Sequence, residues 1–85
     1  MQIFYSSKFE KEYKTLPKRA KFMAEEKEKI FRRNPFDAQL NTHKLKGKLK
    51  DYWSFSIDFH YRIIFEFAES GIVWFHSVGT HSIYN

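Results

Sequence analysis

Hydrophobic residues in the first part of the chain recur at helical spacing. Phe9, Tyr13 and Leu16 fall at positions i, i+4 and i+7, which share one face of a helix. Ser7 and Glu10 stand in the S-x-x-E relation of a capping box, so the helix is predicted to begin directly after the serine. The short segment QIFYS before it is rich in β-prone residues and predicts a strand.

A second apolar stripe of helical period follows Pro17, a residue that suits the first turn of a helix. The stripe comprises Ala20, Met23, Ala24, Ile30 and Phe31. Asn34-Pro35 ends it, because the residue before a proline is biased away from the helical conformation. Together the two stripes predict a helical hairpin.

The second half of the chain changes to a period of two, which is typical of half-buried strands. The segment YWSFSIDF alternates throughout, and one of its faces carries Trp53, Phe55, Ile57 and Phe59. A tight turn around residues 58–60 leads into YRIIFEF, and the turn sequence AESG separates this from IVWFHSV. The order β-α-α-β-β-β predicts an α+β fold in which the helical hairpin packs on one face of an antiparallel sheet.

Residues 34–51 have no sustained period and are predicted to be mostly loop. Four lysines of this loop are spaced by two, so an extended backbone would point all of them in one direction. They are Lys44, Lys46, Lys48 and Lys50. Solvent exposure explains such a row about as well as contacts to phosphates do.

Length and composition limit the class of protein. The 85 residues form one domain, 1–85, and ten Phe, five Tyr and two Trp supply its core. There is no cysteine, which excludes disulfides and thiolate metal sites, and the absence of a signal peptide or membrane-spanning run predicts a cytoplasmic protein. The net charge of +5 favours an anionic partner such as nucleic acid or an acidic protein segment.

Arg62 interrupts a strand of large apolar residues and stands directly beside two isoleucines. Successive side chains of a strand point to opposite faces, so Arg62 and Glu66 are predicted to lie opposite the core. That face is either an ordinary solvated surface or a concave site in which a fixed cation binds an anion. The preceding loop supplies His43 to it, and the tail supplies His81 and Tyr84.

The histidines do not predict a metal site. His43 and His81 lack a partner at the HxH or HxxxH spacing of metal ligands, so no metal or other cofactor is expected. His76 lies within an aromatic strand, on the predicted face of Trp74 and Val78, where a structural role is expected.

The segment THKLKGKLKDYWSFSIDFHYRIIFEF, followed by HSVGTH, resembles the RelE and ParE toxin superfamily of toxin–antitoxin systems. The resemblance is greatest to its RelE, YoeB and YafQ-like mRNA interferases, and the order of elements fits over nearly the whole chain. It implies a toxin that cuts messenger RNA, commonly in the ribosomal decoding site. It also implies a cognate antitoxin protein that holds the toxin inactive.

The resemblance also implies site residues. Arg62 matches the strand arginine that RelE and YoeB-like toxins place beside the scissile phosphate. His43 matches the histidine of the H-x-L-x-G motif in YafQ-like members, and His81 in GTH matches their C-terminal catalytic histidine. The usual C-terminal aromatic residue is Tyr84, which follows His81 by three positions where four are expected.

Three positions depart from the family patterns. Ser54 and Ser56 stand where RelE has lysines, and Ser56 also falls where YafQ-like proteins have another histidine. His60 stands where the YafQ-like branch has an aspartate. The chain therefore resembles a hybrid of the branches.

RNA cleavage without a metal uses the 2′-hydroxyl as nucleophile. Its proton must be removed, the 5′-leaving oxygen protonated and the charge on the phosphate stabilised. Histidine suits the two proton transfers and arginine the third task. We predict His43 as base and His81 as acid, in roles that are exchangeable, with Arg62 as phosphate clamp. Tyr84 is predicted to stack on a base or orient it, and the lysines to contact the RNA backbone.

Two other functions remain open on the sequence. A ParE-like inhibitor would trap DNA gyrase without chemistry, and the histidines flanking Arg62 argue against it, because binding alone requires no titratable groups. A catalytically degenerate nucleic-acid-binding protein is supported by the charge and by the absence of the RelE lysines. Convergence of Arg62, His43 and His81 on one cleft is the feature that would favour the enzyme.

Overall fold

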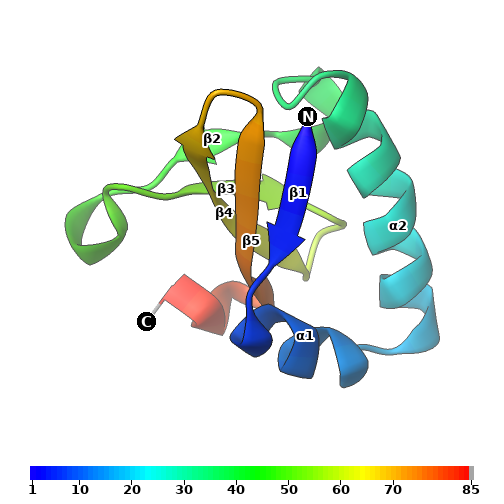
Figure 1. Cartoon of the computed structure of the whole chain (residues 1–85). Helices are drawn as coiled ribbons and strands as arrows, with labels where there is room; N and C mark the ends of the chain where they lie inside the picture. Colours follow the sequence, from blue (N-terminus) through cyan, green and yellow to red (C-terminus); the bar gives the residue numbers. More distant parts are fainter. Residues whose placement is uncertain (85) are drawn as a thin grey trace.

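The computed structural model describes residues 1–84 and shows the predicted order of elements (Figure 1). The strands are β1 Gln2–Tyr5, β2 His43–Lys44, β3 Trp53–Ser56, β4 Arg62–Glu69 and β5 Ile72–Gly79. The α-helices are α1 Ser7–Lys14 and α2 Lys18–Arg33, and the 3₁₀ turns are η1 Ala38–Leu40, η2 Gly47–Leu49 and η3 His81–Tyr84. The two-residue strand β2 lies inside the segment predicted as loop.

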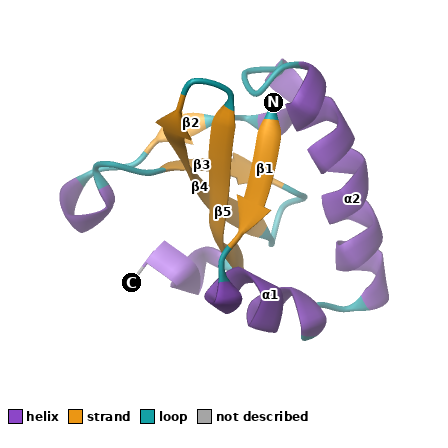
Figure 2. Cartoon of the chain, in the orientation of Figure 1, coloured by secondary structure: helices purple, strands orange, loops and turns teal. Residues whose placement is uncertain are grey.

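The five strands form one sheet in the order β1-β5-β4-β3-β2. The meander of β2, β3, β4 and β5 is antiparallel, as predicted, but β1 runs parallel to β5 and makes the sheet mixed. Helix α2 covers one face, and the opposite face is flanked by η3 and the loop that carries η2 (Figure 2). The α+β architecture with a helical hairpin before the sheet is therefore confirmed.

The core is a cluster of phenylalanines between α2 and the sheet. Phe31 of α2 is fully buried, and its ring centroid lies 5.0 Å from that of Phe55, 4.9 Å from that of Phe65 and 5.4 Å from that of Phe75. These rings come from α2, β3, β4 and β5, so one helical side chain joins three strands. Large aromatic surfaces let a short chain remove enough apolar area from water to fold without a disulfide.

The first helix begins one residue earlier than the predicted capping box requires. Ser6, not Ser7, is the N-cap, because its hydroxyl accepts a hydrogen bond from the backbone N–H of Phe9 at 3.0 Å. The same hydroxyl donates to the carbonyl of His76 on β5 at 2.9 Å. A contact distant in sequence therefore decides which serine caps the helix.

Phe59 is not a core residue, contrary to the alternation. Strand β3 ends at Ser56, and the carboxylate of Asp58 accepts hydrogen bonds from the backbone N–H groups of His60 at 2.8 Å and Tyr61 at 2.7 Å. This turn places Phe59 at its tip, 95% exposed. The predicted turn is confirmed, and its side-chain hydrogen bonds end the period of two before Phe59.

A β-bulge changes the faces of β5. Ile64 pairs with Ser77, but Phe65 pairs with Phe75, so His76 is an extra residue in β5. Beyond the bulge, Val78 faces the core rather than sharing a face with Trp74 and His76, as its 2% exposure shows. The imidazole Nε2 of His76 lies 2.8 Å from the carboxylate of Glu66, which is a structural contact.

Replacing Phe31 with alanine should remove the contacts that join α2 to three strands. We expect the free energy of unfolding to fall by about 3–5 kcal/mol, measured by urea denaturation. Phe22→Ala is the matched control, because Phe22 lies on the same helix and is 61% exposed. Equal losses in the two variants would contradict this description of the core.

Candidate active site

Arg62 opens β4 on the face of the sheet away from α2. Its cross-strand neighbours are Ser56 on β3 and Gly79 on β5. Among residues 1–84, Arg62 takes part in no ion pair, and its buried Nε is without a hydrogen-bond partner. A buried polar group normally has a partner, so this guanidinium is a donor suited to an anion bound at the same face.

Gly79 allows the C-terminal tail to fold back over this face. A Cβ atom at position 79 would lie 2.6 Å from the Cγ2 atom of Ile83, which is too close for two carbon atoms. The tail then forms η3, and the hydroxyl of Tyr84 lies 2.6 Å from that of fully buried Ser54 on β3. This hydrogen bond fastens the end of the described chain to the sheet.

His81 packs against the anchored tyrosine. The ring centroids of His81 and Tyr84 lie 4.8 Å apart, with the planes nearly perpendicular. Residues three apart lie on the same side of a 3₁₀ helix, so the spacing of three between these residues suits η3. The histidine itself is exposed, so substrate can reach its imidazole.

His43 approaches the same face from β2, where it pairs with Ser54. Its Nδ1 lies 3.0 Å from the carbonyl oxygen of Asn41. A carbonyl can only accept a hydrogen bond, so this contact places the proton of a neutral imidazole on Nδ1 and leaves the lone pair on Nε2. The backbone of Asn41 is left-handed, with φ 53°, and this shapes the short loop that makes the contact.

The four lysines do not point in one direction. Gly47, with φ 65°, starts the 3₁₀ turn η2 and breaks the extended backbone that the spacing by two requires. Lys44 pairs with Trp53 and lies over its ring, 5.9 Å from the centroid, on the face opposite His43. Lys46 and Lys48 remain near the site. They line a hollow of about 380 Å³ together with Leu45, Leu49 and Tyr84.

The three side chains predicted to take part in chemistry therefore lie on one face of the sheet. They are those of Arg62, His43 and His81. Ser54 connects two of them, since it pairs with His43 and bonds to Tyr84, which in turn packs on His81. Arg62 is opposite Ser56, two residues farther along β3. Sequence reasoning noted Ser54 only as a departure from RelE, and no signal in the sequence identified it as the residue that anchors the tail.

The described part of the chain shows neither a metal-ligating cluster nor a membrane-spanning helix. Residues 1–84 contain no group of three His, Asp or Glu side chains that could hold a metal ion. No helix within these residues is long and apolar enough to span a membrane.

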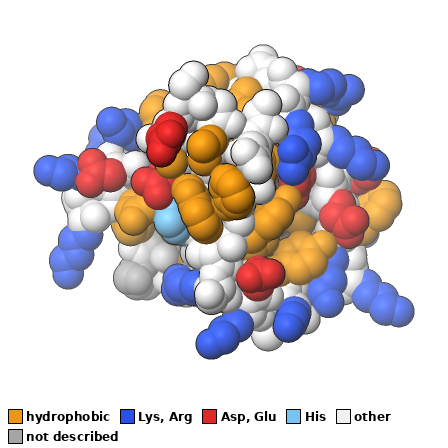
Figure 3. All heavy atoms as spheres, in the orientation of Figure 1, with side chains coloured by type: hydrophobic (Ala, Val, Ile, Leu, Met, Phe, Trp, Pro, Cys, Tyr) orange, Lys and Arg blue, Asp and Glu red, His pale blue; other side chains and the backbone are white. Residues whose placement is uncertain are grey.

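A larger hollow, of about 540 Å³, lies away from these residues. Tyr5, Phe9 and Tyr13 form part of its apolar lining between β1 and the two helices, where hydrophobic side chains gather in Figure 3. Burial, and then the hydrogen bond to Glu28, raise the pKa of Tyr5. The lining contains no histidine, and its ionisable side chains include Glu10, Glu25 and Glu28.

A model of one protein family matches residues 1–84, and its description is "Bacterial toxin of type II toxin-antitoxin system, YafQ". The chain belongs to the YafQ toxin family. It is thus a type II toxin–antitoxin toxin, as the resemblance to the RelE and ParE superfamily implied. A comparison with curated protein sequences found no match.

Solved structures share the YafQ-family fold over nearly the whole chain. YafQ from E. coli strain BL21(DE3) is 23% identical, with a TM-score of 0.80 over 98% of this chain and 96% of that one. A YoeB/ParE toxin from Agrobacterium tumefaciens is 20% identical, with a TM-score of 0.81 over 95% and 99%. YafQ in the E. coli DinJ-YafQ toxin-antitoxin complex is 26% identical, with a TM-score of 0.73 over 96% and 93%.

Replacing Gly79 with alanine should displace the tail from the sheet. Ile83 is β-branched and its Cγ2 cannot rotate freely away, so the new Cβ should move η3 as a whole. We expect loss of the nuclear Overhauser contact between the rings of His81 and Tyr84. The double variant Gly79→Ala with Ile83→Ala removes the clashing methyl and should restore the contact. An unchanged contact in the single variant would show that this close approach does not hold the tail.

Proposed function

We propose that this YafQ-family toxin is an mRNA interferase that cleaves RNA without a metal. The observation that carries the proposal is the arrangement around Arg62. Within residues 1–84, a guanidinium without an anionic partner lies on the same face as two histidines, one of them held in a defined tautomer. This combination supplies a cation for the phosphate and two groups that transfer protons near neutral pH.

The reaction divides among these residues. His43 accepts the proton of the ribose 2′-hydroxyl at Nε2, and the resulting oxygen attacks the adjacent phosphorus. His81 donates a proton to the departing 5′-oxygen, so the products are a 2′,3′-cyclic phosphate and a free 5′-hydroxyl. Arg62 binds the phosphate oxygens as negative charge accumulates on them. The two histidines can exchange roles, because each can accept or donate a proton.

Tyr84 and the lysine loop position the RNA. The tyrosine lines the hollow together with Lys46 and Lys48 and packs against the ring of His81, where it can stack on a base or orient it. Lys46, Lys48 and the exposed Lys50 contact the RNA backbone. Lys44 is not included, because it faces the other side of β2. The substrate is messenger RNA, bound on the ribosome as in the interferase branches that the sequence resembles.

The second partner is a cognate antitoxin with an acidic segment. The net charge of +5 suits such a partner, and a YafQ relative has been crystallised with DinJ. The antitoxin contacts the lysine loop or the helical hairpin and covers the site, which prevents cleavage in the host cell.

Removing the side chains of the site should abolish cleavage. We expect His43→Gln, His81→Gln and Arg62→Ala each to lower the rate by roughly 10²–10⁴-fold, because each removes one proton transfer or the phosphate clamp. The readout is the mapping of transcript 5′-ends after expression of the toxin in cells. Arg33→Ala is the control for the loss of one positive charge, since Arg33 is exposed at the end of α2.

Two outcomes would reject the interferase. New transcript ends in the Arg62→Ala variant at the wild-type level would exclude the site. Growth arrest without new transcript ends, accompanied by trapped gyrase, would favour the ParE-like function instead.

The association of toxin and antitoxin should depend on salt. Long-range attraction between the basic toxin and an acidic segment accelerates encounter, so the association rate should fall as ionic strength rises. The dissociation rate should change less, because apolar contacts dominate it. Stopped-flow mixing across salt concentrations measures both rates. An association rate that is independent of salt would contradict the acidic partner.

A further inference from the structure

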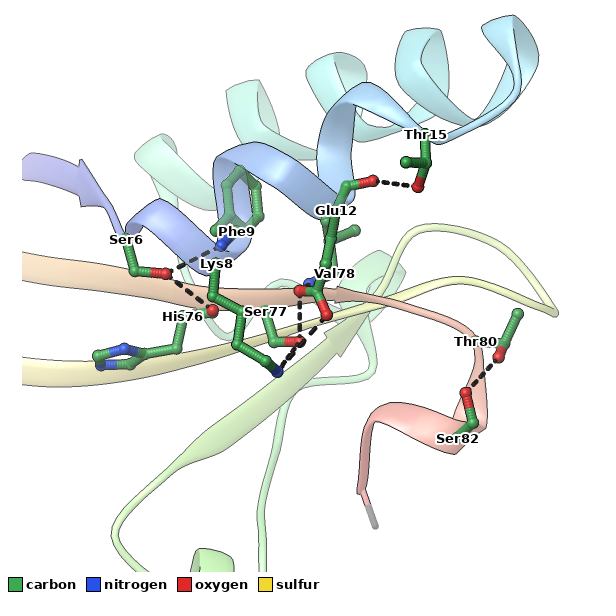
Figure 4. A network of polar contacts seen from close by, with 10 residues as sticks. All are labelled: Ser6, Lys8, Phe9, Glu12, Thr15, His76, Ser77, Val78, Thr80 and Ser82. Carbon is green, nitrogen blue, oxygen red and sulfur yellow. Dashed lines mark hydrogen bonds and ion pairs between the residues drawn. The ribbon is translucent and has the colours of Figure 1, made fainter.

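Strand β5 is longer than the strand beside it. β1 pairs with β5 only from Ile72 to Phe75, and β5 continues to Gly79. The backbone groups on that edge therefore need other partners beyond Phe75. Helix α1 lies along this part of the edge and supplies them (Figure 4).

The N-cap and the second half of α1 contact β5 at the bulge and directly after it. At the N-cap, the backbone N–H of Ser6 donates to the carbonyl of Phe75 at 3.0 Å. The hydroxyl of Ser6 donates to the carbonyl of His76 at 2.9 Å. Farther along α1, Glu12 Oε1 accepts from the hydroxyl of Ser77 at 2.7 Å and from the backbone N–H of Val78 at 3.1 Å. Figure 4 shows the serine and the glutamate on the α1 side of β5, the serine beside His76 and the glutamate beside Ser77 and Val78.

The bulge makes this contact important for the site. A strand with an extra residue can shift its pairing, and a shift by one residue turns every following side chain to the other face. Directly after the bulge, Val78 pairs with Ile63 and Gly79 with Arg62. The glutamate carboxylate binds Val78 at this point and so holds the register that brings Gly79 opposite Arg62.

We propose that Glu12 is a positioning residue of the candidate active site. It acts through Val78 and Gly79, which set the point at which the tail leaves β5 and therefore the position of His81. It does not touch the proposed substrate. The part of the inference that concerns catalysis rests on the proposed function, whereas the position of the tail can be measured without it.

The test compares two substitutions of the same side chain. Glu12→Ala leaves the hydroxyl of Ser77 and the N–H of Val78 without their acceptor. Glu12→Gln retains an oxygen that can accept both bonds, but it removes the negative charge and the ion pair between Oε2 and Lys8 Nζ, which lie 3.5 Å apart. Glu10→Ala is the control on the same helix, because Glu10 is exposed there.

In RNA cleavage, we expect Glu12→Ala to lower kcat by roughly tenfold to a hundredfold with little change in KM, because a small misplacement of a catalytic group slows the chemical step. Glu12→Gln and Glu10→Ala should retain the wild-type kcat. In NMR spectra, Glu12→Ala should weaken the contact between the rings of His81 and Tyr84 and speed hydrogen exchange at the Val78 amide. If the alanine variant does not fold, Glu12→Asp replaces it, since the shorter side chain should not reach Val78.

Two results would overturn the inference. The first is a folded Glu12→Ala, or Glu12→Asp, variant with the wild-type kcat and an intact contact between His81 and Tyr84. The second is a Glu12→Gln variant that loses activity as fully as the alanine variant, which would assign the effect to charge. If the wild-type chain cleaves no RNA, the proposed function fails, and the NMR measurements alone decide whether Glu12 positions the tail.

Discussion

The fold depends on the position of β5 between the first strand of the chain and β4. Gln2 pairs with Ile72, so the five-stranded sheet is complete only when the first strand of the chain meets the last. The same strand places Phe75 against Phe31 in the core and carries the tail with His81 beyond Gly79. Pairs this distant in sequence carry a high entropic cost of closure, which the surrounding aromatic contacts offset.

The bulge in β5 divides the strand into a part that packs in the core and a part that leads to the candidate site. Before it, Phe75 and Val73 face the core, while Trp74 faces the other side. After it, Val78 faces the core, and the next residue lies opposite Arg62. Uninterrupted alternation would leave Val78 on the side of Trp74 and Gly79 on the core face. The inserted residue thus lets one strand close the core and also direct its end toward the candidate site.

The candidate site keeps an arginine that has no anionic partner in the described part of the chain, at some cost in stability. Desolvating part of a guanidinium with no partner is unfavourable, and the aromatic core has to offset that loss. An anion that binds only the folded protein offsets this cost, so anion binding at this face and stability are thermodynamically linked. A protein partner that covers the same face with acidic groups would compete for the same interaction.

The sequence by itself determined the two helices, the strands β3, β4 and β5, and the core face of β4. It also singled out Arg62, His43, His81 and Tyr84 as candidates for the site. These follow from local periodicity, from turn residues and from resemblance to a family. Tertiary structure alone decided that Ser6 caps α1, that Phe59 is exposed, that Lys44 faces away and that Ser54 anchors Tyr84. Each depends on a turn, on strand pairing or on a hydrogen bond between residues distant in sequence, and hydrophobic periodicity records only which side chains prefer to leave water.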